Sequence, residues 1–135
     1  MTGYQTYQQH RVQGATPLGL VLLTYEALYK SLARARAAVL AGDLAAEAEQ
    51  TGLAMEALIE LSSSLDMEQG EDIARSLASL YLYMMNRLTE GLCSCSTEAI
   101  DDVSKLVQEL REGWIGLAAA QNEAPTPTQQ AVQAA

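Results

Sequence analysis

Four stretches of the chain place apolar residues at alternating spacings of three and four, the period of an α-helix with one buried face. The first stretch begins at Thr16-Pro17, where threonine suits the N-cap and proline the first helical position. It ends at Gly42, which suits a helix C-terminus, and Asp43 suits the N-cap of the next helix. The predicted buried face of this helix consists of Leu18, Leu22, Tyr25, Tyr29, Leu32, Arg36 and Val39, among which Arg36 fits least.

The other three stretches predict helices with buried faces of different strength. The second face contains small and hydroxyl residues and consists of Leu44, Ala48, Thr51, Met55, Leu58, Ser62 and Leu65. After a turn at Gln69-Gly70, the third helix runs to about Leu92, and its buried face consists of Ile73, Leu77, Leu80, Met84 and Leu88. The last face consists of Ile100, Val103, Val107, Leu110, Trp114 and Leu117.

Helices that are joined by short turns run antiparallel to their chain neighbours. We therefore predict an all-α fold, an antiparallel up-down-up-down four-helix bundle over residues 16–121. Residues 1–15 are polar except for a few apolar positions, and they predict a flexible N-terminal arm. Residues 122–135 consist mainly of Pro, Thr, Gln and Ala without periodicity, and they predict a disordered C-terminal tail.

The third predicted helix has more apolar surface than a bundle needs. Beside its main face it carries a second stripe, so that apolar residues cover more than half of the helix. That second stripe consists of Ala74, Ala78, Tyr81, Met85, Leu88 and Leu92. A bundle helix needs one apolar stripe. The surplus indicates that the protein holds a partner.

Composition and charge argue against a nucleic-acid-binding protein and against a membrane-spanning one. The net charge is −9, and residues 43–72 hold nine of the 17 acidic residues and no basic one. Nucleic acid would be repelled by such a chain, and the acidic stretch is most simply a solvated helix face. No apolar run approaches the roughly 20 residues of a membrane span. The polar start lacks a hydrophobic signal core, so we expect a cytosolic location.

Residues for catalysis or metal binding do not form a recognisable set. Cys93 and Cys95 are too close in sequence for an easy disulfide, and two thiols do not complete a zinc site. His10, the one histidine, lies in the arm, so the Glu-x-x-His pairs of a di-iron bundle are missing. Asp101 and Asp102 point to different faces and are expected to face water. We predict no catalytic residue, no metal, no cofactor and no enzymatic activity.

Several short runs, in order along the chain, resemble one known family. They are YQQHRV followed by ATP at the first helix start, then LVLLTYEAL, SLDMEQGEDIA, LYLYM and, in the last helix, ELREGW. With matching spacing over nearly the whole predicted bundle, this set resembles the flagellin-specific export chaperone family, FliS. The sequence departs from the family pattern at Leu82, which stands for Asp, and at Asn86, which stands for the first of two Arg. Glu71 stands for the second Gly of a Gly-Gly pair, and Glu26-Ala27 for Asp-Gly.

The resemblance implies a function and a partner. Members of this family bind the disordered C-terminal segment of newly made flagellin in the cytosol. They wrap that segment as helices and extended pieces, prevent premature polymerisation and deliver it to the flagellar type III export apparatus. A surplus apolar helix surface suits such capture. Whether an export-gate component or an anti-sigma factor is also bound stays open.

The candidate partner-binding residues come from three places. Tyr7, and with less reason Tyr4, belong to an arm that the resemblance implies can fold over the groove. Leu20, Leu23 and Ala27 form a second stripe on the first helix and could belong either to the core or to a groove. On the third helix, some of Tyr81, Leu82 and Met85 are expected to be core, and Leu82 is the best candidate for exposure.

Besides the flagellin chaperone, the sequence leaves a second and a third function open. The extra apolar face could form a homodimer, or it could make the protein a helical adaptor that binds a regulatory protein instead of flagellin. A carboxylate-metal enzyme is the third reading, and the missing ligand pattern argues against it.

Overall fold

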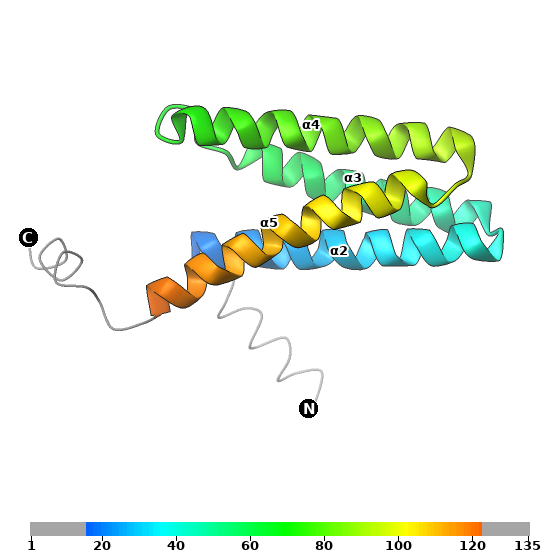
Figure 1. Cartoon of the computed structure of the whole chain (residues 1–135), viewed down its shortest axis with the longest axis horizontal. Coiled ribbons are helices and arrows are strands. Elements are labelled where there is room, and N and C mark those ends of the chain that lie inside the picture. The colour runs from blue at the N-terminus through cyan, green and yellow to red at the C-terminus, as the bar shows by residue number, and fades with distance from the viewer. Residues whose placement is uncertain (1–15, 123–135) are drawn as a thin grey trace, which may run out of the picture.

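The computed structural model describes residues 16–122, which form four helices. They are α2 (Pro17–Ala41), α3 (Leu44–Ser63), α4 (Glu71–Ser94) and α5 (Glu98–Asn122). Each helix packs against its neighbour in the chain, and α5 closes the ring by packing on α2 (Figure 1). The predicted four-helix bundle is confirmed. The predicted arm and tail, apart from residue 122, lie outside the described residues.

The predicted caps of the first helix and the start of the second are confirmed. The Thr16 side chain accepts a hydrogen bond from the Gly19 amide at 2.9 Å. Gly42 has φ 70°, a left-handed conformation that suits glycine because it lacks a Cβ. The Asp43 side chain accepts from the Ala46 amide at 3.0 Å. The α2–α3 hairpin is therefore set by local chemistry.

The core of α2 lies on a slightly different face from the predicted one. Tyr25 and Leu32 are buried as predicted, but Leu28 and Ala35 complete the buried stripe where the prediction placed Tyr29 and Arg36. Both displaced residues lie at the helix edge toward α5. The Tyr29 ring lies under the Arg111 guanidinium at 5.9 Å. Arg36 donates to Asp101 at 2.8 Å, so the polar misfit in the predicted stripe is an ion pair at the surface.

Predicted core residues near helix ends are often exposed. Leu44 and Leu117 are exposed, and the Ile73 side chain is 73% exposed. Helix ends extend past the region where all four helices meet, so helical period alone overestimates how far the core reaches. The fully enclosed centre consists of Tyr25, Leu28, Leu32, Ala35, Ala54, Leu58, Tyr81, Met84, Leu88, Val103 and Val107.

A polar contact crosses this apolar centre. The Tyr25 and Tyr81 hydroxyls share a hydrogen bond of 2.6 Å. Burial raises the pKa of both phenols, most strongly that of Tyr81, so both stay neutral. The pair joins α2 and α4, which lie diagonally across the bundle without backbone contact.

Candidate partner-binding groove

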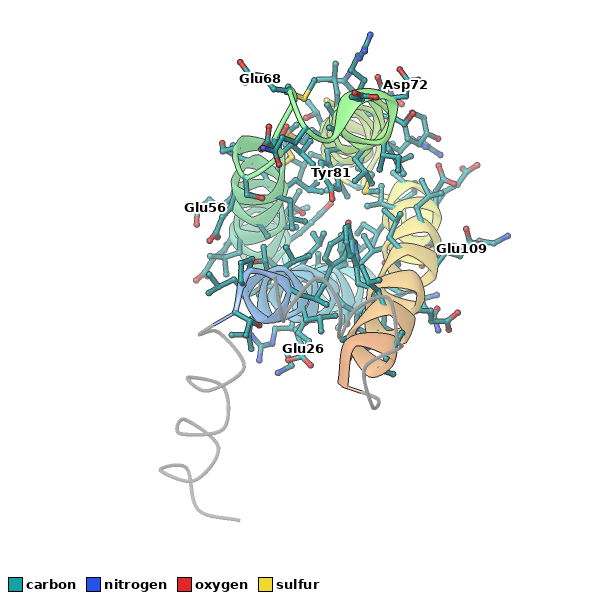
Figure 2. The ribbon with its side chains drawn as sticks, turned by 90° about the vertical axis from the view of Figure 1, so that its left-hand side faces the viewer. Glu26, Glu56, Glu68, Asp72, Tyr81 and Glu109 are labelled. Carbon is teal, nitrogen blue, oxygen red and sulfur yellow. The ribbon has the colours of Figure 1, made fainter. Side chains whose placement is uncertain are left out.

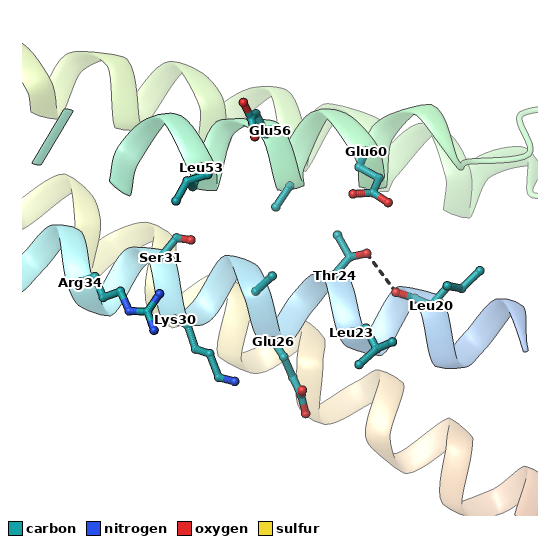
Figure 3. Close-up of a pocket in the computed structure, with 12 residues that line it drawn as sticks. Leu20, Leu23, Thr24, Glu26, Lys30, Ser31, Arg34, Leu53, Glu56 and Glu60 are labelled. Atoms are coloured by element: carbon teal, nitrogen blue, oxygen red, sulfur yellow. Dashed lines mark hydrogen bonds between the residues drawn. The ribbon is translucent and has the colours of Figure 1, made fainter. Parts of the chain in front are cut away.

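The second stripe of α2 faces α3 across an open groove. Leu20, Leu23 and Ala27 line it from α2, and Leu53 and Ala57 line it from α3, around a volume of about 580 Å³ (Figure 3). We call this surface the α2–α3 groove. Alanines at facing positions leave space between the helices, because no long side chain fills it. The Leu20 side chain is 55% exposed although it is apolar. The groove therefore offers apolar surface that the bundle itself does not bury.

Charged residues form the walls of the α2–α3 groove. Lys30 and Arg34 stand on the α2 wall, and Glu56 and Glu60 stand on the α3 wall. The structure gives none of these four an ion pair with any described residue. Glu26, which also lines the groove, differs because its carboxylate lies 3.6 Å from the Arg111 guanidinium.

Two smaller recesses continue the groove around the end of the bundle. The first, of about 260 Å³, shares Leu20, Thr24 and Glu60 with the α2–α3 groove. The second, of about 220 Å³, shares Val21, Leu61 and Ser64 with the first recess. Because neighbouring recesses share lining residues, the three adjoin one another along a path that starts along α2 and α3 and turns at the bundle end. We call this path the apolar track, although three of the six shared residues, Thr24, Glu60 and Ser64, are polar.

The last recess of the track lies where α4 begins and α5 ends. Its walls include Ile73, Leu77 and Tyr81 from α4, and Trp114 from α5. The two helices diverge at this end of the bundle (Figure 1). The exposed Ile73 therefore forms part of an apolar recess. A partner that follows the whole track has to change direction between the groove and this recess.

The structure brings three of the predicted site residues together. Leu20, Leu23 and Ala27 all line the α2–α3 groove and are not part of the buried core. That they bind a partner stays a prediction. Tyr4 and Tyr7 lie outside the described residues.

The predicted residues on α4 are divided between core and surface. The Tyr81 side chain is 1% exposed and points into the bundle (Figure 2), so only its edge meets the last recess. Leu82 is 56% exposed, in agreement with the prediction of exposure. Met85 is half-buried against the core. Neither Leu82 nor Met85 lines the track, because α4 reaches it only with its N-terminal part, from Ile73 to Tyr81.

Sequence reasoning missed the α3 side of the groove. Leu53 and Ala57 are apolar, four residues apart and outside the predicted buried stripe of this helix. This spacing was the one sequence signal that could have indicated a second apolar face on α3. The two α5 acids that were expected to face water are partly exposed, with 49% of the Asp101 side chain and 40% of the Asp102 side chain accessible. Sequence reasoning missed their bonds to other helices: Asp101 is bonded to α2, and Asp102 to α4.

Asp102 is the centre of a polar cluster between α4 and α5. The Tyr83 hydroxyl donates to it at 2.7 Å and the Arg87 Nε at 3.2 Å. The Tyr83 hydrogen bond is the main reason why the pKa of Asp102 is lowered, and the same bond raises the pKa of the Tyr83 phenol. Arg87 also lies 3.5 Å from Glu90. We call Tyr83, Arg87 and Asp102 the α4–α5 seam.

Metal and membrane chemistry find no support within residues 16–122. In that range no three His, Cys, Asp or Glu residues come together in an arrangement that could hold a metal ion. None of the described helices combines the length and apolar character that crossing a bilayer demands.

Comparison with known proteins places the chain in a family. Residues 1–122 match the family described as flagellar protein FliS. The chain belongs to the FliS family. A flagellar secretion chaperone FliSB of Pseudomonas aeruginosa is 33% identical over 121 residues, covering 87% of this chain and 96% of that protein.

Two further relatives carry the name flagellar secretion chaperone FliS. The one from Vibrio cholerae is 30% identical over 104 residues, which cover 77% of this chain and 76% of that protein. The one from Salmonella typhimurium is 30% identical over 118 residues, which cover 84% of this chain and 87% of that protein. Membership of the FliS family makes the protein a chaperone of flagellum assembly.

Proposed function

We propose that this protein is a cytosolic export chaperone that binds the disordered C-terminal segment of flagellin. Binding prevents premature polymerisation, and the chaperone delivers the segment to the flagellar type III export apparatus. The observation that carries the proposal is the continuous apolar track of a FliS-family bundle, which begins in the α2–α3 groove.

The shape of the track suits a cargo that folds as it binds. The α2–α3 groove extends along α2 from Leu20 to Arg34, about 21 Å at 1.5 Å per residue, which is enough for about four turns of helix. The track then turns at the bundle end, where a rigid helix could not follow. A disordered segment can place a helix in the groove and an extended piece in the recesses. Each buried apolar Å² contributes about 25 cal/mol.

A calorimetric titration tests the proposal. Flagellin with an intact C-terminal segment should bind with a large negative heat-capacity change, since apolar burial and coupled folding both produce one. Binding should persist in moderate salt, because the groove floor is apolar. Flagellin lacking the segment should not bind. Equal binding of the two flagellins would contradict the proposal.

A groove-filling substitution assigns the binding to this surface. Ala27 is exposed on the groove wall, so Ala27→Gln places a longer neutral side chain there without entering the core. We expect an affinity loss of at least about tenfold, equivalent to about 1.4 kcal/mol. The melting temperature should stay within a few degrees.

The matched control is Ala37→Gln, which changes an exposed alanine of the same helix outside the groove. It should leave affinity unchanged. If Ala27→Gln binds flagellin as the wild type does, the cargo uses another surface.

The alternatives are a homodimer and an adaptor for a regulatory protein. A dimer through the track would sediment as two copies and would compete with the flagellin segment. The same titration therefore separates these readings: a protein that ignores flagellin but self-associates would favour the dimer.

A further inference from the structure

The four unpaired charges of the α2–α3 groove are ordered along its length. Glu60 also lines the next recess beside Leu20 and Thr24, so it marks the end of the groove where α2 begins. Lys30 and Arg34 lie further along α2, toward its C-terminus (Figure 3). The groove therefore changes from acidic to basic in the direction of α2.

Within the described residues, nothing neutralises this gradient. Lys30, Arg34 and Glu60 are exposed, and none of them forms an ion pair or hydrogen bond with another described side chain. By contrast, Glu26 and Arg36, also on α2, are both paired with α5 residues. The paired charges of α2 are thus held by α5, although Glu26 also lines the groove, and Lys30 and Arg34 line the groove without such a partner.

A bound helix responds to such a gradient because its two ends carry opposite partial charges. The N-terminal end has unsatisfied amides and is equivalent to about half a positive charge, and the C-terminal end is correspondingly negative. An acidic residue stabilises the first end and a basic residue the second. Only one direction of a helix in the groove satisfies both interactions.

We propose that the α2–α3 groove orients its occupant: an amphipathic helix that runs parallel to α2, with its N-terminus beside Glu60 and its C-terminus beside Lys30 and Arg34. Acidic side chains in the last turn of the occupant strengthen this orientation. The inference rests on the proposed function in taking the groove as a helix-binding site, but it can be tested without flagellin.

The test uses a designed peptide of about 16 residues, matched to the groove length at 1.5 Å per residue. The peptide has blocked ends, a Leu/Ala stripe and glutamates in its last turn. A nitroxide label is placed at either its first or its last residue, and broadening of the protein's amide signals is recorded by NMR. The C-terminal label should broaden amides around Arg34 and Gln50, and the N-terminal label those around Leu20 and Ser64. The reverse pattern, similar broadening at both ends, or no binding would overturn the inference.

A charge-reversed groove provides the second arm. The quadruple variant Lys30→Glu, Arg34→Glu, Glu56→Lys and Glu60→Lys keeps the net charge and changes only exposed side chains. Each charge near a helix end alters binding about two- to fivefold at low salt. The designed peptide should therefore bind at least about fivefold more weakly, or in reversed direction, and salt should reduce the difference.

The control variant exchanges charges away from the groove, Lys105→Glu with Glu109→Lys on α5, and should bind as wild type does. Unchanged affinity and direction in the quadruple variant would overturn the inference. A correctly oriented designed peptide together with absent flagellin binding would overturn the proposed function alone. Flagellin binding with a randomly oriented designed peptide would overturn this inference alone.

Discussion

On the α2–α3 side of the bundle, four charged side chains line the groove without an ion pair to any described residue, whereas on the α4–α5 side charged and polar side chains bind one another. Lys30 and Glu56 both line the α2–α3 groove, and neither forms an ion pair with a described residue. In the α4–α5 seam, one Asp102 oxygen accepts from both Tyr83 and Arg87. Both sides are made of antiparallel helices, so the helical pattern does not cause the difference.

The comparison teaches how polar groups divide between stability and recognition. Paired groups of the seam and the interior contribute to folding and are already satisfied. Unpaired groups at the groove contribute little to folding, since exposed charges in water are worth little, and they remain available to a partner. Substitutions on the two sides should therefore change different measurements.

The largest expected effect concerns the interior Tyr25–Tyr81 hydrogen bond. Tyr81→Phe should lower the free energy of unfolding by about 1–3 kcal/mol, because it leaves a buried Tyr25 hydroxyl without a partner. The double variant Tyr25→Phe/Tyr81→Phe should cost less than the sum of the two single ones, since no hydroxyl is then left unpaired. Urea unfolding measures both.

Tyr29→Phe is the matched control, because this tyrosine contacts Arg111 through its ring. It should change stability by less than about 0.5 kcal/mol. If the destabilisation in the double variant equals the sum of the two single ones, the hydrogen bond between Tyr25 and Tyr81 does not stabilise the bundle. The statement that paired interior groups contribute to folding would then be wrong.

Turn conformation sharpens the comparison at the helix ends. The α2–α3 turn places Gly42 in the left-handed region. At the ends of α4 this region is occupied by non-glycine residues, namely the first helical residue Glu71 at φ 47° and the C-cap Cys95 at φ 53°. Glu71→Gly and Cys95→Gly should each stabilise the protein by about 0.5–1 kcal/mol, and Gly42→Ala should destabilise it by about 1 kcal/mol. Thermal unfolding checks the signs. Destabilisation by Glu71→Gly would mean that its side chain contributes more than its backbone costs.

The smallest expected effect is the pH response of the seam. The pKa of Asp102 is lowered from its ordinary value of 3.8 in the folded protein, so its contribution is present above that value and is lost as pH falls through the lower folded pKa. Asp102→Asn should therefore be less stable than wild type at pH 7, by under about 1 kcal/mol because the group is partly solvated. This difference should vanish in acid.

Asp72→Asn controls for exposed carboxylates, since the Asp72 side chain is 95% exposed beside Arg75. It should have no measurable effect on stability. Flagellin affinity should be unchanged in Asp102→Asn. A tenfold loss of affinity there would place the seam in the binding surface and break the division between the two sides.

Part of the candidate site could be predicted from the sequence, and part could not. Leu20, Leu23 and Ala27 stood out as a second stripe at helical spacing, and the structure places all three in the groove. Leu53 and Ala57 escaped because a small residue and one leucine do not make a visible stripe. Tyr81 and Leu82 are adjacent in sequence, and only packing against α2 decides that one is core and the other surface.

Helical period, capping residues and turn glycines determined the four helices, their order and their antiparallel arrangement, because these signals act within a few residues of each other. Tertiary structure alone decided how far each helix is rotated about its axis, because rotation depends on how side chains from three helices fill one space. That rotation turned Arg36 and Asp101 toward each other, left Lys30 and Arg34 beside an open groove, and joined three recesses into one track.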